Sequence, residues 1–262
     1  MEAIYRVSGQ QVETNASAAG PWHPEMQHGA APAALVAWAA EQLPADVPMS
    51  LARLSLDLCR PVPVGPLRIR PAIVRAGKKI QLVTIDLLAN DVEVVRASVL
   101  RVRQSDAQTP EDVRRLLLDL PPPEASYDIA PEHRARCRFL EGVSAKLASG
   151  PERVRGPTAM WFRADQPIVD GAPISAAMRA AIASDFCNGV SSPLDPQQWS
   201  FVNGDTTVHL ARLPIGEWIL VDAATILGGS GGGIASAALA DRDGYFGRAS
   251  QSLIIERRSS TV

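Results

Sequence analysis

The sequence lacks the features that mark several large classes of protein. Its 262 residues contain only three cysteines, Cys59, Cys137 and Cys187, and widely spaced thiols in an odd number predict neither a disulfide framework nor a paired metal knuckle. Lys plus Arg is 26 against 28 for Asp plus Glu, so no nucleic acid or anionic membrane is expected as a partner. Residues 1–14 lack a signal-peptide pattern, and no apolar run approaches the roughly 20 residues of a membrane span. We expect a cytoplasmic protein with buried free thiols.

The first half of the chain predicts one helix followed by an antiparallel meander, which is an α+β arrangement. Residues 4–14 are typical of a hairpin, and residues 33–43 form a helix with almost no polar face, which other structure must wrap. Strand-like runs follow at residues 51–59, 67–75, 79–88 and 93–102. A capped helix is predicted at residues 109–120, before a proline-rich linker.

The second half repeats the first at a constant offset. Adding 152 to Arg60 gives Arg212, and adding it to Asp91 gives Asp243, with no gap between them. Apolar positions keep the same register over about 40 residues, which predicts two copies of one fold. We place the copies at residues 1–104 and 131–262, with a helix and linker at residues 105–130 between them.

A second apolar helix is predicted at residues 173–186, with Pro173 at its first position. Asp185 continues its apolar face, where an unpaired charge is costly to bury. The helix dipole does not explain an acid in the last turn. Two interpretations stay open: Asp185 is a functional buried acid, or the helix has ended and the side chain caps a turn at residues 187–189.

The two copies differ where a site would lie. Gln251 corresponds to the apolar Val99, and Asp185 has no acidic counterpart in the first helix. The first helix begins at Gly29 among small residues that leave its backbone N–H groups accessible, whereas Ala172-Pro173 removes a donor from the second. The polar residues of the second half and the accessible helix start of the first half complement each other, which predicts one site per chain.

Other motifs carry less weight. Residues 228–232 match G-x-S-x-G, but the last histidine, His209, precedes them, so a glycine-rich hairpin is the better interpretation. Asp205 and His209 would lie roughly 13 Å apart in one strand, which leaves a hydratase as a minor alternative. The four histidines lack ligand spacing, so neither a metal nor a cofactor is expected. His28 either shapes the entrance of the first helix or is a satisfied loop residue.

Stretches spanning nearly the whole chain resemble the type II acyl-CoA thioesterase family, the double hotdog enzymes. The stretches that carry the resemblance are His28-Gly29-Ala30-Ala31-Pro32-Ala33-Ala34-Leu35, Arg60-Pro61-Val62-Pro63-Val64-Gly65-Pro66-Leu67, Ala183-Ser184-Asp185-Phe186, Asn203-Gly204-Asp205, Gly216-Glu217-Trp218 and Asp241 to Gln251. The resemblance implies two tandem hotdog units, each with a central helix wrapped by an antiparallel sheet.

The resemblance also implies site residues. In that family a catalytic Asp, Thr and Gln of the second unit hold a water near the start of the first unit's helix. By position these residues fall on Asp185, Asn203 and Gln251, so that Asn replaces Thr. The Gly-Gly helix start becomes Gly29-Ala30, which keeps its backbone N–H groups.

The implied activity is hydrolysis of acyl-CoA thioesters to a free acid and coenzyme A. Asp185 would act as the base, with Gly29, Ala30 and His28 forming the oxyanion and substrate side of the site, and an apolar tunnel between the two helices would hold the acyl chain. The alternatives are a non-catalytic acyl-CoA-binding protein and, with less support, a hotdog enoyl-CoA hydratase. A homodimer or homotetramer is expected.

Overall fold

The computed structural model describes residues 1–105, 118–129, 137–150 and 155–258. The predicted helix at residues 109–120 lies outside this part except for its last three positions. The predicted opening hairpin is present as β1 (Tyr5–Ser8) and β2 (Gln11–Thr14), and the first central helix as α1 (Ala30–Gln42). Among the helices that the structure describes, none has the length and hydropathy needed to cross a membrane.

The strands confirm the meander and its repeat. The four predicted strands of the first half are β3 (Met49–Leu58), β4 (Leu67–Ala76), β5 (Ile80–Ala89) and β6 (Val92–Arg103). Their counterparts are β11 (Asp205–Leu210), β12 (Ile219–Leu227), β13 (Gly232–Asp241) and β14 (Gly244–Arg257). β12, β13 and β14 each begin 152 residues after β4, β5 and β6, so the repeat continues through three successive strands without insertion.

The two halves join into one continuous sheet with a local twofold axis at its centre. The strand order is β1-β2-β4-β5-β6-β3-β11-β14-β13-β12-β9-β8-β7, and β3 pairs antiparallel with β11. At this junction Ser55 lies opposite Thr207, with their hydroxyl oxygens 2.7 Å apart. Since these two residues are separated by the repeat offset of 152, the axis that relates the units passes between them.

The remaining elements belong to the segment before α1, to the connection between the units and to the second unit. They are η1 (Ala16–Ala18), η2 (Pro123–Ala125), β7 (Tyr127–Asp128), α2 (Arg138–Glu141), β8 (Val143–Ser149), β9 (Thr158–Ala164), α3 (Ala176–Ser184), α4 (Cys187–Ser191) and β10 (Trp199–Asn203). The glycine-rich stretch between β12 and β13 is the hairpin expected from the sequence, with Gly228 N–H donating to the carbonyl of Gly232 at 2.8 Å.

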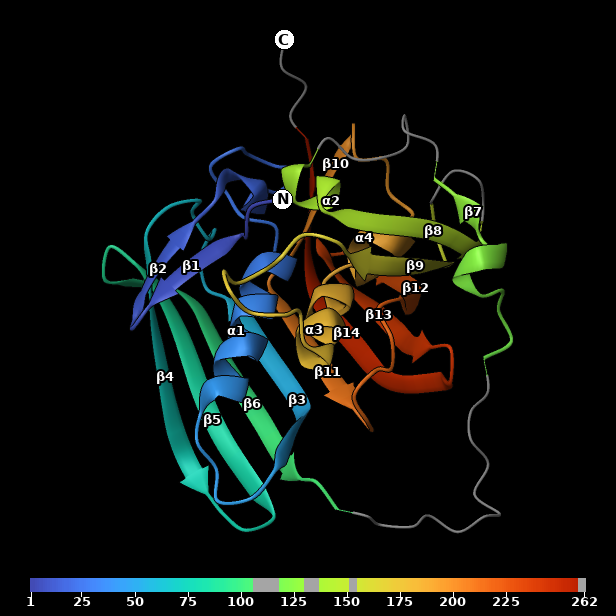
Figure 1. The fold of residues 1–262 in the computed structure, drawn as a ribbon. Helices are drawn as coiled ribbons and strands as arrows, with labels where there is room; N and C mark the ends of the chain where they lie inside the picture. Colours follow the sequence, from blue (N-terminus) through green and yellow to red (C-terminus); the bar gives the residue numbers. More distant parts are fainter. Residues whose placement is uncertain (106–117, 130–136, 151–154, 259–262) are drawn as a thin grey trace.

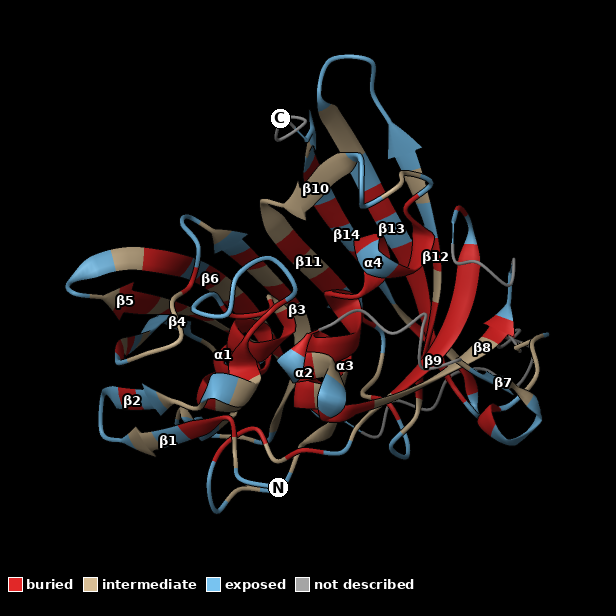
Figure 2. Ribbon diagram, turned by 90° about the horizontal axis from the view of Figure 1, so that it is seen from above, coloured by how far each residue is buried: buried red, intermediate tan, exposed pale blue. Residues whose placement is uncertain are grey.

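The helices α1 and α3 lie side by side within the curve of the sheet (Figures 1 and 2). Both consist largely of buried apolar residues, many of them alanines. The small volume of the alanine side chains lets the two helices approach closely. They run in opposite directions, because Gly29 at the start of α1 meets Asp185 at the end of α3, while Ser175 before α3 meets Glu41 near the end of α1. This is the double hotdog arrangement, with the interface between the units at the centre.

The start of α3 differs from the prediction. The helix begins at Ala176 and not at Pro173, with Ser175 as the N-cap residue. The Ser175 hydroxyl accepts a hydrogen bond from Met178 N–H at 3.1 Å and donates to Glu41 at 2.6 Å. A side-chain cap therefore closes this helix end, and the missing donor of Pro173 plays no part in it.

Candidate functional site

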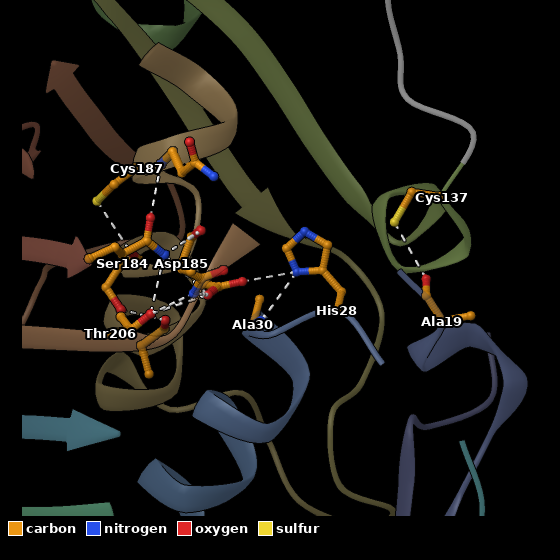
Figure 3. A network of polar contacts seen from close by, with 12 residues as sticks. Ala19, His28, Ala30, Cys137, Ser184, Asp185, Cys187 and Thr206 are labelled. Atoms are coloured by element: carbon orange, nitrogen blue, oxygen red, sulfur yellow. Dashed lines mark hydrogen bonds and ion pairs between the residues drawn. The ribbon is translucent and has the colours of Figure 1, made fainter. Parts of the chain in front are cut away.

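Asp185 lies at the junction of the two units. It is the C-cap residue of α3, directly before Phe186 and α4, and its side chain is only 4% exposed (Figure 3). The carboxylate does not cap the turn at residues 187–189, but faces Gly29 at the start of α1. A Cβ added to Gly29 would lie 2.6 Å from Asp185 Oδ1 and 2.8 Å from Oδ2, so glycine is needed here for the close approach.

Three side chains donate hydrogen bonds to one oxygen of this carboxylate. Asp185 Oδ1 accepts from Asn203 Nδ2 at 3.0 Å, from Thr206 Oγ1 at 3.3 Å and from Gln251 Nε2 at 3.3 Å. All three donors come from β10, β11 and β14 of the second unit. Hydrogen bonds to an ionised acceptor are stronger than neutral ones, so this set fixes Oδ1 and leaves Oδ2 toward the first unit.

Gln251 also fixes the backbone on which Asp185 is mounted. Its Nε2 donates to the Asp185 carbonyl at 3.0 Å, and its Oε1 accepts from Asn188 N–H at 2.9 Å. Both polar atoms of this buried side chain are thus occupied by protein groups. Gln251 therefore positions the α3–α4 junction, whereas the resemblance implies that it holds a water.

A β-bulge brings the other two donors to the same face. Asn203 lies opposite Leu253, whereas Thr207 lies opposite Ser250, so the four residue steps from Asn203 to Thr207 match only three steps on β14. One extra residue reverses the strand alternation. Asn203 and Thr206, which a regular strand would direct to opposite faces, therefore both reach Asp185.

The sequence prediction missed Thr206. The resemblance implies a threonine beside the acid and assigns that position to Asn203, but the structure places both side chains there and joins them by a 3.2 Å hydrogen bond. Strand alternation contained the signal, because Thr206, Val208 and Leu210 are the buried positions of β11. The bulge concealed how Asn203 could share that face.

His28 contacts the other oxygen of the carboxylate. Its Nδ1 lies 3.1 Å from Asp185 Oδ2, and the same atom accepts a hydrogen bond from Ala30 N–H at 3.2 Å (Figure 3). The ring stacks on Phe139 of α2, with 4.9 Å between centroids, and lies 5.5 Å from the ring of Phe186. Of the two interpretations open at the sequence level, the contact with Asp185 favours a place in the site.

The start of α1 offers few backbone donors. Ala31 N–H is bonded to the His28 carbonyl at 3.0 Å, and Ala33 N–H to that of Gly29 at 3.1 Å. Ala30 N–H is bonded to the His28 ring. Among the hydrogen bonds of the described residues, none comes from Gly29 N–H. Gly29 N–H is therefore available to a substrate oxygen at this helix terminus, whereas Ala30 N–H becomes available only when its hydrogen bond to the His28 ring breaks.

Thiol chemistry is not available beside the carboxylate. Burial raises the pKa of Cys187 strongly, and the charge of neighbouring Asp185 raises it further. Its thiol donates to the Ser184 carbonyl at 3.1 Å. Burial also raises the pKa of Cys137. Because a thiolate is the nucleophilic form, neither cysteine is suited to attack a substrate.

The polar pair considered for a hydratase is not part of this site. Asp205 accepts the Ser252 N–H at 2.6 Å and so closes the bulge beside β14. His209 is exposed on β11, opposite Arg53 of β3 and Arg248 of β14. The two residues therefore have separate roles in the sheet.

A small apolar depression lies behind the site, between α3 and strands β9 and β12. It has an empty volume of about 190 Å³ including space open to solvent, and its lining residues are Phe162, Ala164, Arg179, Ile182, Ala183, Glu217 and Ile219. Phe162 stacks on Phe186 at 4.3 Å between centroids, which connects this wall to the site. The acyl tunnel between the helices stays a prediction.

The fold and the carboxylate at the unit interface define a double hotdog chain with one asymmetric polar site. Residues 18–102 match the model of the acyl-CoA thioesterase N-terminal domain, and residues 103–255 match that of the C-terminal domain. The chain therefore belongs to the acyl-CoA thioesterase family. No curated protein matches it.

Solved structures share the fold over nearly the full length. A hot dog fold protein of unknown function from Alicyclobacillus acidocaldarius aligns with a TM-score of 0.78 at 17% identity, covering 97% of this chain and 96% of the other. The tesB protein of Mycobacterium avium subspecies paratuberculosis gives 0.70 at 14%, covering 96% and 95%. The acyl-CoA thioesterase II TesB2 of Mycobacterium marinum gives 0.66 at 12%, covering 98% and 96%. At these identities the likeness establishes the fold alone.

Proposed function

We propose that the protein hydrolyses acyl-CoA thioesters to a free acid and coenzyme A, with Asp185 as the general base. The observation that carries this proposal is the buried Asp185 carboxylate, which is held by three donors of one unit and directed at the helix start of the other. Membership of the acyl-CoA thioesterase family supports the substrate class.

In the proposed reaction the thioester carbonyl lies at the start of α1. The N–H groups of Gly29 and Ala30, together with the positive end of the helix dipole, stabilise the negative charge that develops on its oxygen. Asp185 Oδ2 takes a proton from a water as the water oxygen attacks the carbonyl carbon. The tetrahedral intermediate then collapses, and the carbon–sulfur bond breaks with its electron pair on sulfur. The thiolate of coenzyme A takes up the proton that Asp185 removed from the water, so that Asp185 is again a carboxylate.

Asn203 is suited to orient this water. Its Nδ2 donates to Asp185 Oδ1 at 3.0 Å and to Thr206 Oγ1 at 3.2 Å, while no hydrogen bond among the described residues reaches its Oδ1. Asn203 is also partly exposed. The Oδ1 atom can therefore accept a hydrogen bond from the attacking water.

The test is thiol release from short, medium, long and aromatic acyl-CoAs by the wild type, Asp185→Asn and Asp86→Asn. Asp86 pairs with Arg70 on the first unit's sheet at 2.9 Å, so its variant controls for loss of a paired carboxylate elsewhere. We expect Asp185→Asn to lower kcat by roughly 10² to 10⁴ and Asp86→Asn to leave it unchanged. Full turnover by a folded Asp185→Asn protein would refute the assignment of the base.

The same assay separates the alternatives. Binding of acyl-CoA without thiol release from any member of the panel would indicate a non-catalytic binding protein. Hydration of an enoyl-CoA without thiol release would indicate a hydratase.

A further inference from the structure

The ring of His28 faces two groups that its Nδ1 atom cannot serve at the same time. Ala30 N–H points at Nδ1 from 3.2 Å, and Asp185 Oδ2 lies 3.1 Å from the same atom. A bare Nδ1 can accept from Ala30, whereas a protonated Nδ1 can donate to Asp185. The protonation of one ring nitrogen therefore decides which of these two groups is bonded.

Little else can compensate the charge of this pair. The side chains of His28 and Asp185 are 10% and 4% exposed. The titratable or charged side chains on the elements packed against His28 are Asp185 and Cys187 on either side of Phe186, Cys137, Arg138 and Glu141 in and before α2, and His23 and Glu25 beside Trp22. Both cysteines are buried, and their thiols donate to the carbonyls of Ala19 and Ser184, while Arg138, Glu141, His23 and Glu25 are exposed to solvent. Asp185 is thus the titratable group in direct contact with the ring.

We propose that His28 relays a proton and thereby couples proton removal to oxyanion stabilisation, an inference that rests on the proposed function. At rest Nδ1 is bare and holds Ala30 N–H. During attack the proton that Asp185 Oδ2 takes from water passes to Nδ1, which lies within hydrogen-bond distance. A protonated Nδ1 no longer accepts from Ala30, so this N–H is released to the substrate oxygen as its charge develops.

The cycle balances in protons and electron pairs. The water O–H bond breaks, its oxygen bonds to the carbonyl carbon, and the carbonyl π pair moves to the oxygen. The proton moves from Oδ2 to Nδ1, and Asp185 is again a carboxylate. When the carbon–sulfur bond breaks, the sulfur keeps the electron pair and takes the proton from Nδ1, directly or through water. Nδ1 is then bare again and recaptures Ala30 N–H.

The resting state can be tested without substrate. In ¹⁵N-histidine-labelled protein at the pH of maximal turnover, we expect His28 Nδ1 to give a chemical shift typical of an unprotonated nitrogen and Nε2 that of a protonated one. The His28→Asn spectrum identifies the signals by their loss, and the exposed His23 and His209 serve as internal references. A His28 Nδ1 that is protonated at rest would overturn the proposal.

The coupling is tested with His28→Asn and the matched control His209→Asn. Asparagine retains a donor and an acceptor close to the position of Nδ1 but cannot carry the proton. We expect His28→Asn to lower kcat roughly 10- to 100-fold with little change in KM and to change the pH profile of kcat, while His209→Asn matches the wild type. Wild-type kcat and pH profile in folded His28→Asn would contradict the coupling. If the wild type releases no thiol at all, the proposed function fails, and the nitrogen shifts still decide the state of the ring.

Discussion

Gly29→Ala is the most direct perturbation of the contact between the two units. The added Cβ would lie 2.6 Å from Asp185 Oδ1, about 0.8 Å closer than the 3.4 Å at which ordinary contacts begin. The backbone of Gly29 is helical, with φ −57° and ψ −27°, so alanine meets no conformational obstacle. Any effect of the substitution must therefore come from the collision with the carboxylate.

The carboxylate cannot move away without losing its donors. A displacement of about 0.8 Å along the line to Asn203 would change this 3.0 Å separation to about 3.8 Å or about 2.2 Å, and both values lie outside hydrogen-bond range. Overpacking of this kind costs about 1 to 3 kcal/mol, and a base misplaced by about 1 Å loses about 10² in rate. We therefore expect Gly29→Ala to lower the free energy of unfolding by about 1 to 3 kcal/mol and kcat by about 10².

Urea denaturation and thiol release measure the two effects, with Gly65→Ala as the control. A Cβ at Gly65 would meet no atom within 4 Å, so its stability should stay within about 0.5 kcal/mol of the wild type. In an Asp185→Ala background the collision disappears, and we expect the two substitutions to couple by about 1 kcal/mol or more. An equal cost of Gly29→Ala in both backgrounds, or no cost in either, would refute this reasoning.

Three further substitutions test the surroundings of the site and of the fold. Thr206→Val removes one of the three donors to Asp185, so kcat should fall about tenfold and stability by about 1 to 3 kcal/mol, whereas Thr207→Val should leave kcat unchanged. Burial alone would raise the pKa of Asp241, but hydrogen bonds from Arg212 and backbone N–H groups lower it overall. The ionised Asp241 therefore stabilises the folded protein above the unfolded-state pKa, and this stabilisation is lost as pH falls. Asp241→Asn should cost about 3 kcal/mol near neutral pH, and acid denaturation curves should show a smaller cost at low pH. Burial raises the pKa of Glu41, and a raised carboxyl pKa means that stability is lost as pH rises, so Glu41→Gln should be the more stable protein at pH 8 and lose that advantage toward pH 4.

The sequence predicted the elements whose pattern is local. The helix predicted at residues 33–43 from its near lack of polar residues is present at residues 30–42, and the four strands after it follow from strand-forming runs and turn residues. The offset of 152 extended the strand assignments to the second half. Asp185 was identifiable as unusual because an acid on an apolar helix face has no structural explanation in the helix itself.

The errors concern contacts whose partners are remote in sequence. Pro173 was a reasonable helix start by propensity, but the N-cap is Ser175, whose hydroxyl also bonds Glu41 in the other unit. Thr206 was missed because a one-residue bulge reversed the strand alternation after Asn203. Neither the bulge nor a contact between units leaves a periodic signal in the chain.

The asymmetry of the two helix ends explains why one chain has one candidate site. At the start of α1 the cap residue Gly29 has no side chain, which leaves room for the carboxylate of Asp185 and for backbone donors. At the start of α3 the cap residue Ser175 does have a side chain. Its hydroxyl accepts from Met178 N–H and donates to Glu41. A carboxylate thus meets a helix start at both ends of the helix pair, so Glu41 is a spatial counterpart of Asp185 that the sequence comparison did not find. A side chain fills the space between carboxylate and helix start only at the Ser175 end. Substrate could approach backbone N–H groups at the Gly29 end, whereas at the Ser175 end the hydrogen bond between Ser175 and Glu41 joins the two units.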